Sequence, residues 1–360
     1  MSKTISLRIH IIPILLILLS GVSCTRQEQV GDGITVILSS GLPETRGDTP
    51  EETAANVKDG KEICFDNGTP DIVLLMFDGN TLVARYPGTG SEILTSPTPT
   101  GNDMRIRIAR DLNGNMLSAG TYSVYALANT KGLWGDPAIS SITTKSAADA
   151  FVLNTRPTSL IADRMPLTAI GTVDVNSSGN GAAEVNMLRP VGKVVVRFIN
   201  NYGKTLTLSP FSLTLRNMSA SNGYLFPHTS NDVPGGVSYI NLEKSVSSPA
   251  TLVLPDYRDQ GEVFEYESLV YPGAAGDLNA GDFTCDLAFS ITHVGGNPLA
   301  APEDFSFSKL SILNKRGEDV TSIARNQQLT ITVNISQGKM LSFSFEVGAW
   351  GKYTENVSFD

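Results

Sequence analysis

Few residues in this chain of 360 have the types and spacing that enzyme chemistry requires. There are three histidines. His10 lies in an apolar N-terminal segment, and His228 and His293 stand alone, without the HExxH or CxxC spacing of a metal site. The chain also lacks a GxSxG elbow and the glycine motifs that bind phosphates or dinucleotides. We therefore predict a protein that is not an enzyme and that holds no metal or cofactor.

The overall charge argues against a nucleic acid as the binding partner. A net charge of −9 and an isoelectric point of about 4.9 exclude the basic surface that nucleic-acid binding needs. The acidic residues are spread thinly, so the charge indicates solubility rather than a charged partner. With 41% hydrophobic residues the chain can bury a substantial core, and its length suggests two domains.

Cys24 is the first residue with a predicted chemical fate. A positively charged start precedes the apolar run Ile11–Leu19, which is too short to span a bilayer. The run leads through small residues to Cys24 and resembles a bacterial lipobox, although Gly21 stands where leucine is preferred. We expect a signal peptide over residues 1–23 and acyl chains on Cys24, each buried CH₂ contributing ~0.8 kcal/mol to membrane anchoring. An ordinary signal peptide with an incidental cysteine is the alternative.

The two other cysteines, Cys64 and Cys285, lie far apart in the sequence. In an exported protein they could form a disulfide, or both could be buried thiols. The sequence leaves both alternatives open.

Arg46 is the second residue of chemical interest. Residues Ile34–Leu38 form an apolar run that is typical of a buried strand, whereas Gly41–Asp48 is polar and rich in turn-forming residues. A protease reaches an exposed loop more easily than a strand within a sheet. Arg46 therefore lies where a protease could cut the chain while leaving the strand intact.

The rest of the chain alternates apolar and polar residues with a period of two. The apolar strand Ile72–Phe77 is followed by a turn at Asp78–Asn80 and a returning strand from Thr81. Further runs are Tyr122–Leu127, Val191–Ile199, Phe211–Leu215, Thr251–Leu254, Phe283–Ile291 and Phe305–Leu313. Glycine and proline separate the runs at intervals of roughly 8–12 residues, which is typical of an antiparallel sandwich or barrel. One short helix is expected at Thr144–Ala150, capped by Thr143 or Thr144.

The clearest alternation lies near the C-terminus, where two strands are expected on either side of a turn at Gln337–Lys339. Their apolar residues are Leu329, Ile331, Val333 and Ile335 in the first strand, and Leu341, Phe343, Phe345 and Val347 in the second. The chain then continues to Val357 and Phe359 in a polar setting. Because chain ends are usually frayed and polar, this much apolar surface needs something to bury it.

Several motifs follow one another along nearly the whole chain. They are the lipobox at Cys24, the strand that leads to Glu44–Gly47, the hairpin Ile72–Gly79, and the segments Gly120–Asn129, Arg164–Leu167, Leu188–Val194 and Arg325–Leu329. In this order they resemble the fimbrillin family of Bacteroidetes, whose members are subunits of type V pili. Some positions depart from the family pattern, such as Gly192 where alanine is usual and Leu329 where tyrosine is usual.

The resemblance implies an all-β fold of two transthyretin-like antiparallel β-sandwich domains in tandem. It divides the chain into a signal peptide (residues 1–23), a propeptide (24–46), an N-terminal sandwich (47–181) and a C-terminal sandwich (182–360). The boundary between the sandwiches is taken at the loop-like residues 179–181.

The resemblance also implies a sequence of events. The precursor would reach the outer membrane as a lipoprotein, and an arginine-specific protease would cut between Arg46 and Gly47. The cut would release the strand that contains Ile34, Val36 and Leu38. A strand from another fimbrial subunit would then replace it, and the chain would join a fimbria at the cell surface. Candidates for the donated strand are Leu341, Phe343, Phe345 and Val347, or the segment through Val357 and Phe359.

Physical reasoning supports such an exchange, since a sheet that loses a strand exposes unpaired backbone groups and templates the addition of another. The alternative is a lipid-anchored surface protein that does not polymerise, such as a pilus anchor, a tip adhesin or a glycan binder. A glycan platform needs clustered aromatic residues, and the two tryptophans, Trp134 and Trp350, lie in no aromatic cluster. The position in the pilus, the receptor and the identity of the protease stay open.

Overall fold

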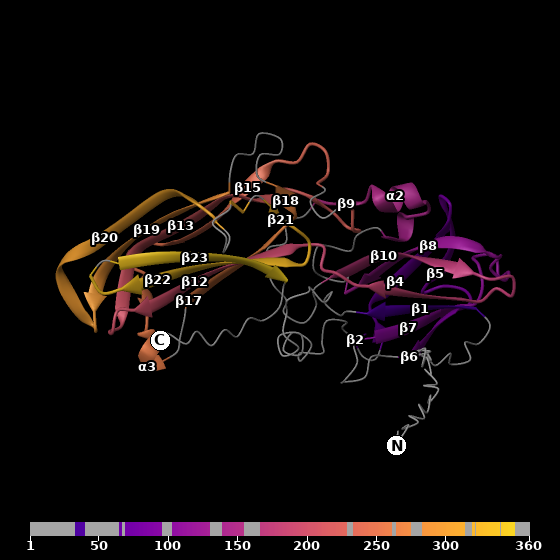
Figure 1. Cartoon of the computed structure of the whole chain (residues 1–360), viewed down its shortest axis with the longest axis horizontal. Helices are drawn as coiled ribbons and strands as arrows, with labels where there is room; N and C mark the ends of the chain where they lie inside the picture. Colours follow the sequence, from indigo (N-terminus) through magenta and orange to yellow (C-terminus); the bar gives the residue numbers. More distant parts are fainter. Residues whose placement is uncertain are drawn as a thin grey trace, which may run out of the picture. The chain divides into compact units, whose positions relative to one another are not determined.

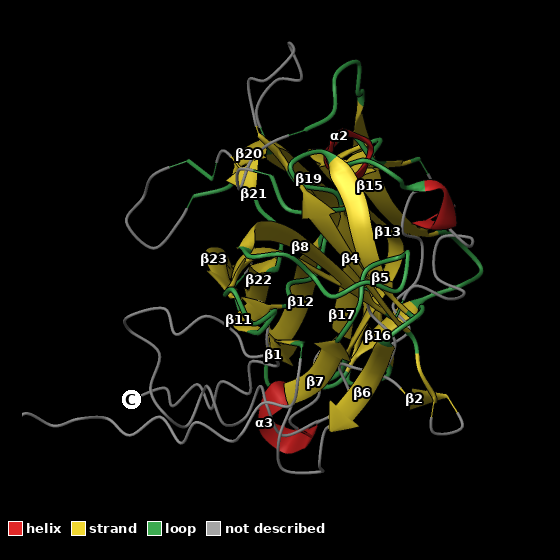
Figure 2. Ribbon diagram, turned by 90° about the vertical axis from the view of Figure 1, so that its right-hand side faces the viewer, coloured by secondary structure: helices red, strands yellow, loops and turns green. Residues whose placement is uncertain are grey.

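The computed structural model describes residues 33–39, 65–66, 69–95, 103–129, 139–154, 166–228, 233–260, 264–274, 283–313, 319–320, 322–338 and 340–349. Most of them lie in β-strands (Figure 2). The predicted all-β fold is therefore confirmed.

Two four-stranded sheets form the first sandwich (Figure 1). Sheet 1 has the order β11 (Gly181–Asn186), β1 (Ile34–Ser39), β7 (Asp103–Ile108), β6 (Ser91–Thr95). Sheet 2 has the order β10 (Leu167–Val175), β8 (Gly120–Ala128), β4 (Ile72–Asp78), β5 (Thr81–Tyr86). Alternate residues of both sheets, such as Val36, Leu74 and Val124, form one buried core between the two layers.

The second sandwich is built in the same way. Sheet 3 has the order β17 (Phe264–Val270), β12 (Gly192–Asn201), β22 (Gln327–Ser336), β23 (Met340–Ala349). Sheet 4 has the order β15 (Tyr239–Val246), β13 (Leu206–Ala220), β19 (Thr284–Val294), β20 (Asn297–Ser311), and β16 (Leu252–Leu254) also pairs with β13. Its core includes Val196, Phe211 and Phe289.

The remaining elements are short. Three two-stranded pairs are β9 (Val152–Leu153) with β14 (Gly223–Tyr224), β18 (Gly273–Ala274) with β21 (Ser322–Ile323), and β2 (Phe65–Asp66) with β3 (Thr69–Pro70). The helical turns are η1 (Ile139–Ser141), α2 (Lys145–Asp149) and α3 (Tyr257–Gln260). The Thr144 side chain caps α2 by accepting the N–H of Ala147, which confirms the predicted helix and one of its two predicted caps.

Sheet 2 is covered on its outer face too. Phe77 and Tyr125 point away from the first core and pack edge to face, with ring centroids 5.3 Å apart. They belong to a third buried cluster, which also contains Ala148 of α2 and two residues that follow β13 in the sequence, Phe226 and Tyr271. Burial on both faces explains why β4 and β8 are almost continuously apolar rather than alternating.

The first sandwich extends past residue 181, where the sequence placed the domain boundary. Residues 176–180 form a turn, in which the N–H of Asn176 donates to the carbonyl of Asn180 at 2.9 Å. The chain then returns as β11 into sheet 1. Glycine and asparagine favour a tight turn inside a domain as much as a linker between domains, so the boundary had no distinct signal. β12, from Gly192, is the first strand that belongs to the second sandwich.

Candidate strand-exchange site

Strand β1 lies in the middle of its sheet rather than at an edge. It pairs in parallel with β11 and antiparallel with β7 along its whole length. Ile34, Val36 and Leu38 are 0% exposed, and the residues opposite them on β7 are Ile108, Ile106 and Met104. The sequence predicted this strand correctly from the apolar run Ile34–Leu38, which only Thr35 interrupts.

Its partner β11 was not predicted, although Ala183 and Val185 carry a weak period-two signal. The short, alanine-containing segment looks like a loop next to the glycine and asparagine that precede it. The parallel register Ile34↔Gly181 to Ser39↔Asn186 closes the second side of β1. Without β11, β1 would be an edge strand, and its removal would leave no slot.

Polar contacts fix both ends of β1. The N–H of Gly33 donates to Asn180 Oδ1 at 2.8 Å, and the N–H of Met187 donates to the carbonyl of Ser39 at 2.7 Å. The Ser39 hydroxyl donates to Glu184 Oε1 at 3.3 Å. All three contacts join β1 to residues 180–187, so β11 and its turn hold the register of the strand.

Gly33 is required where the chain enters β1. Its φ of +126° lies in a region that L-residues rarely adopt. A Cβ at this position would lie 2.9 Å from Ala109 Cα and 2.9 Å from the carbonyl oxygen of Ile108. The backbone of β7 therefore leaves no room for a side chain at Gly33.

The outer face of β1 carries a buried polar side chain, whereas its inner face is apolar. Thr35 is 6% exposed, and its hydroxyl has no hydrogen-bond partner among the described residues. Its neighbours across the sheet are Ala182 and Arg107, and Arg107 forms an ion pair with Glu92 instead.

The candidate donor strand β23 forms a hairpin with β22, as the sequence predicted. The register is continuous from Gln327↔Ala349 to Ser336↔Met340. Leu341, Phe343, Phe345 and Val347 are half-buried against the second core, and the Phe343 ring meets Phe307 of β20 with centroids 5.5 Å apart. These residues therefore take part in their own sandwich, as its edge strand.

Several predicted residues lie outside the described part of the chain. They are Cys24, Arg46, Gly47, Val357, Phe359 and Cys64. Cys285 is described as a free thiol with 0% exposure, and burial raises its pKa to about 12. Such a thiol is a structural group rather than a reactive one.

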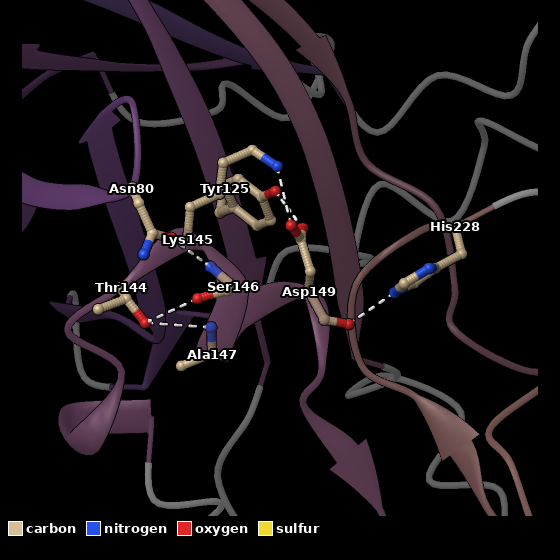
Figure 3. A network of polar contacts seen from close by, with 8 residues as sticks. All are labelled: Asn80, Tyr125, Thr144, Lys145, Ser146, Ala147, Asp149 and His228. Carbon is tan, nitrogen blue, oxygen red and sulfur yellow. Dashed lines mark hydrogen bonds and ion pairs between the residues drawn. The ribbon is translucent and has the colours of Figure 1, made fainter.

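Several titratable side chains form a polar cluster under α2 (Figure 3). The Asp149 carboxylate accepts a hydrogen bond from the Tyr125 hydroxyl and pairs with Lys145 Nζ at 2.8 Å. The His228 ring contacts the Asp149 carbonyl through Nε2 at 2.6 Å. Burial and the bond to Asp149 raise the pKa of Tyr125 to about 12. For Asp149 the two hydrogen bonds outweigh burial and lower the pKa.

The members of this cluster are directed at each other and at the backbone. Lys145 Nζ also lies over the Tyr125 ring, 5.8 Å from its centroid. The arrangement fastens α2 to sheet 2 and to the segment that carries His228. Within the described ranges, no group of three or more His, Cys, Asp and Glu side chains could hold a metal ion.

Two of the motifs behind the family resemblance meet in space and have structural roles. The Arg189 guanidinium is buried and donates to Asn326 Oδ1 at 2.9 Å, and burial lowers the pKa of Arg189 to about 10. A Cβ on Gly192 would lie 2.7 Å from Ile323 Cγ2 and 3.0 Å from the carbonyl oxygen of Ala324. Segments 188–194 and 325–329 thus join the start of β12 to the start of β22.

Several solved structures resemble this chain. A crystal structure of a putative cell adhesion protein from Parabacteroides distasonis superposes with a TM-score of 0.57 at 11% identity, over 91% of this chain and 99% of that one. A fimbrilin from Porphyromonas gingivalis gives 0.48 at 13% identity, over 90% and 99%. The tip fimbrial protein Mfa3 from Porphyromonas gingivalis gives 0.44 at 12% identity, over 89% and 99%. No curated protein matches the sequence. The first of these likenesses shows that the two chains share a fold.

The family follows from the sequence. Residues 46–356 match the family of fimbrillin-A associated anchor proteins Mfa1 and Mfa2, and the chain belongs to this family. The predicted relation to Bacteroidetes fimbrillins is thereby confirmed. The family is one of fimbrial proteins of the cell surface and is not known for enzymes. No helix in the described ranges is both long and apolar enough to cross a membrane.

Proposed function

We propose that this chain is a fimbrial subunit that is exported as a lipoprotein through Cys24, is cut after Arg46, and exchanges β1 for a strand of another subunit. The observation that carries the proposal is the combination of complete burial and first place in the sequence. β1 fills the middle of sheet 1, yet it is the first strand among the described residues. A single cut at Arg46 separates it covalently from every later strand.

The energetics favour replacement over an empty slot. Burial of Ile34, Val36 and Leu38 contributes roughly 2 kcal/mol each, and β11 and β7 would both lose backbone partners if β1 left alone. While the chain is intact, β1 is tethered to its slot and competes with an incoming strand at a high effective concentration. Cleavage removes the tether and with it that advantage. An incoming strand with a similar apolar alternation could then occupy the slot.

A second candidate function is a terminal subunit, an anchor or tip that accepts a strand but donates none. The observation that favours it is the position of β23, whose ten residues pair fully with β22 and whose apolar side chains pack against their own core. Donation of Leu341–Val347 would disrupt sheet 3. If this chain donates a strand, we therefore propose the segment through Val357 and Phe359 as the donor rather than β23.

The test of exchange uses the Cys24→Ala precursor and a matched Arg46→Gln control. Trypsin should cut the first protein after Arg46, the fragment with β1 should separate on gel filtration, and the remainder should form SDS-resistant multimers. Arg46→Gln should keep β1 and form no SDS-resistant multimers under the same treatment. Clean cleavage that leaves a monomer with β1 still bound would refute the exchange.

The donor is tested by truncation after Ala349. Loss of multimers with an unchanged thermal unfolding midpoint would assign donation to residues 350–360. Multimers that persist after truncation would exclude this segment. The lipid anchor is tested separately, since Cys24→Ala should release the protein from the membrane into the periplasm. A variant that stays membrane-bound would contradict lipidation at Cys24.

A further inference from the structure

Four of the edge strands in the described part of the chain carry features that discourage pairing with another strand. β20 contains Pro298, Pro302 and Lys309, and its register with β19 is interrupted twice. β17 carries Glu265 and Glu267, and the registers of β5 and β6 with their neighbours are also interrupted. Proline, charge and bulges are the devices by which natural sheets prevent edge-to-edge association.

The edge strand β23 differs from these. Its register with β22 runs through ten pairs without interruption. Between Leu341 and Val347 there is no proline, lysine or arginine, and Glu346 is the single charged residue. The apolar residues of this stretch are only half-buried, in contrast to the 0% exposure of the inward residues of β1. Figure 2 shows β23 at the outside of its sheet, beyond β22.

The sequence of β23 is complementary to itself in the antiparallel direction. In Leu-Ser-Phe-Ser-Phe-Glu-Val the pattern is nearly symmetric about Ser344. If Ser344 lies opposite Ser344 of a second copy, Phe343 faces Phe345, and Leu341 faces Val347. Aromatic and aliphatic cross-strand pairs of this kind are the stabilising unit of a sheet. Every apolar residue then stays on the inner face, because the register conserves the alternation.

Charge selects the same register. With Ser344 at the two-fold axis, Glu346 lies opposite Ser342 of the other copy. The two Glu346 residues are then separated by four residues along the strands, or about 13 Å. That is beyond the Debye length of about 8–10 Å at ordinary salt, so they repel little. A shift of the register by two residues toward the C-terminus would place the two Glu346 residues directly opposite each other.

We propose that β23 is a docking edge for β23 of a second copy of this chain, so that the two copies form one continuous eight-stranded sheet around a two-fold axis at Ser344. The interface is isologous and closed, so it gives a dimer rather than a fibre. It uses neither the β1 slot nor cleavage at Arg46, and it is therefore independent of the strand exchange proposed above. In a fimbria it would join two chains side by side.

The test begins with the uncut Cys24→Ala, Arg46→Gln chain in sedimentation equilibrium. It should form a dimer, and Ser344→Lys and Ser344→Glu should each raise the dimer dissociation constant about fivefold or more, because like charges then meet at the axis. A mixture of the two variants should restore the dimer as a heterodimer. Ser306→Lys, on the exposed face of β20, is the matched control and should leave the dimer unchanged.

The register is tested by cross-linking in the Cys24→Ala, Cys64→Ser background, in which the remaining Cys285 is buried. Ser344→Cys should form an intermolecular disulfide, since directly opposite Cα atoms lie about 5 Å apart. Ser342→Cys should not, because its opposite residue is Glu346. A monomer at all concentrations, an unaffected Ser344→Lys dimer, or equal cross-linking by both cysteine variants would overturn the proposal.

Discussion

The strands β1 and β23 both have an apolar inner face and have very different places in the molecule. β1 is an apolar run that only Thr35 interrupts, β23 alternates apolar and polar residues, and both stand near one end of the described chain. β1 lies between two strands with its inward side chains fully buried, whereas β23 has one partner and half-buried side chains. The pattern thus predicts that a segment is a strand, and the number of its neighbours decides what the strand can do.

The difference has opposite consequences for exchange. A central strand leaves a slot with two ladders when it departs, so its replacement by another strand restores both sides. An edge strand leaves no slot, and it offers its own free side to a further strand instead. We therefore assign replacement to β1 and addition to β23.

The largest difference is expected for a buried charge in each strand. Val36→Asp places a carboxylate where no water reaches, and it should lower the free energy of unfolding of the uncleaved protein by about 4 kcal/mol or more. Phe343→Asp places its carboxylate on an edge strand, where it can turn to solvent. We expect the free energy of unfolding to fall by about 1–3 kcal/mol. Urea unfolding followed by circular dichroism measures both. Equal losses would break the contrast between centre and edge.

Much of the first of these strands was predictable. The apolar run Ile34–Leu38 indicated a strand, and the hairpin β22–β23 and the cap at Thr144 were predicted from local sequence in the same way. Local patterns report which face of a segment is apolar, and this is enough for the fold class.

The neighbours of β1 were not predictable, because pairing joins residues that are distant in sequence. Residues 181–186 have too few apolar side chains to stand out, yet their parallel pairing with β1 turns an edge into a slot. The pattern also gives no sign that β1–β11 and β12–β22 are parallel pairs in sheets that are otherwise antiparallel. Partner, order and direction depend on long-range packing.

Substitution of the glycines that precede the two strands should give a smaller difference in stability. Gly33→Ala forces a Cβ against the backbone of β7 at a φ of +126°, and we expect a loss of about 2–3 kcal/mol. Gly338 precedes β23 at a φ of +77° with no atom within 4 Å of the added Cβ, so Gly338→Ala should cost only about 1 kcal/mol. After cleavage, Gly33→Ala should also release β1 faster, and Gly338→Ala should not. Release of the fragment can be followed by mass spectrometry.

The smallest effect on stability is expected for a substitution in the polar cluster under α2. Such a substitution tests whether the stability of the first sandwich can change without a change in the release of β1. Asp149→Asn removes a partly exposed ion pair, and at neutral pH the loss should be below about 1 kcal/mol. Because the pKa of Asp149 is lowered in the folded state, its contribution is present above the ordinary value of 3.8 and is lost as the pH falls through the folded-state value. The wild-type and Asp149→Asn unfolding midpoints should therefore converge in acid.

The same variant bears on the comparison between the two strands. Tyr125, the partner of Asp149, points to the face of sheet 2 that is opposite the core shared with β1. Asp149→Asn should consequently leave the rate of β1 release unchanged at neutral pH, while Gly33→Ala raises it. If Asp149→Asn accelerates release as much as Gly33→Ala does, the slot is governed by the stability of the whole sandwich rather than by the contacts of β1 with β11 and β7.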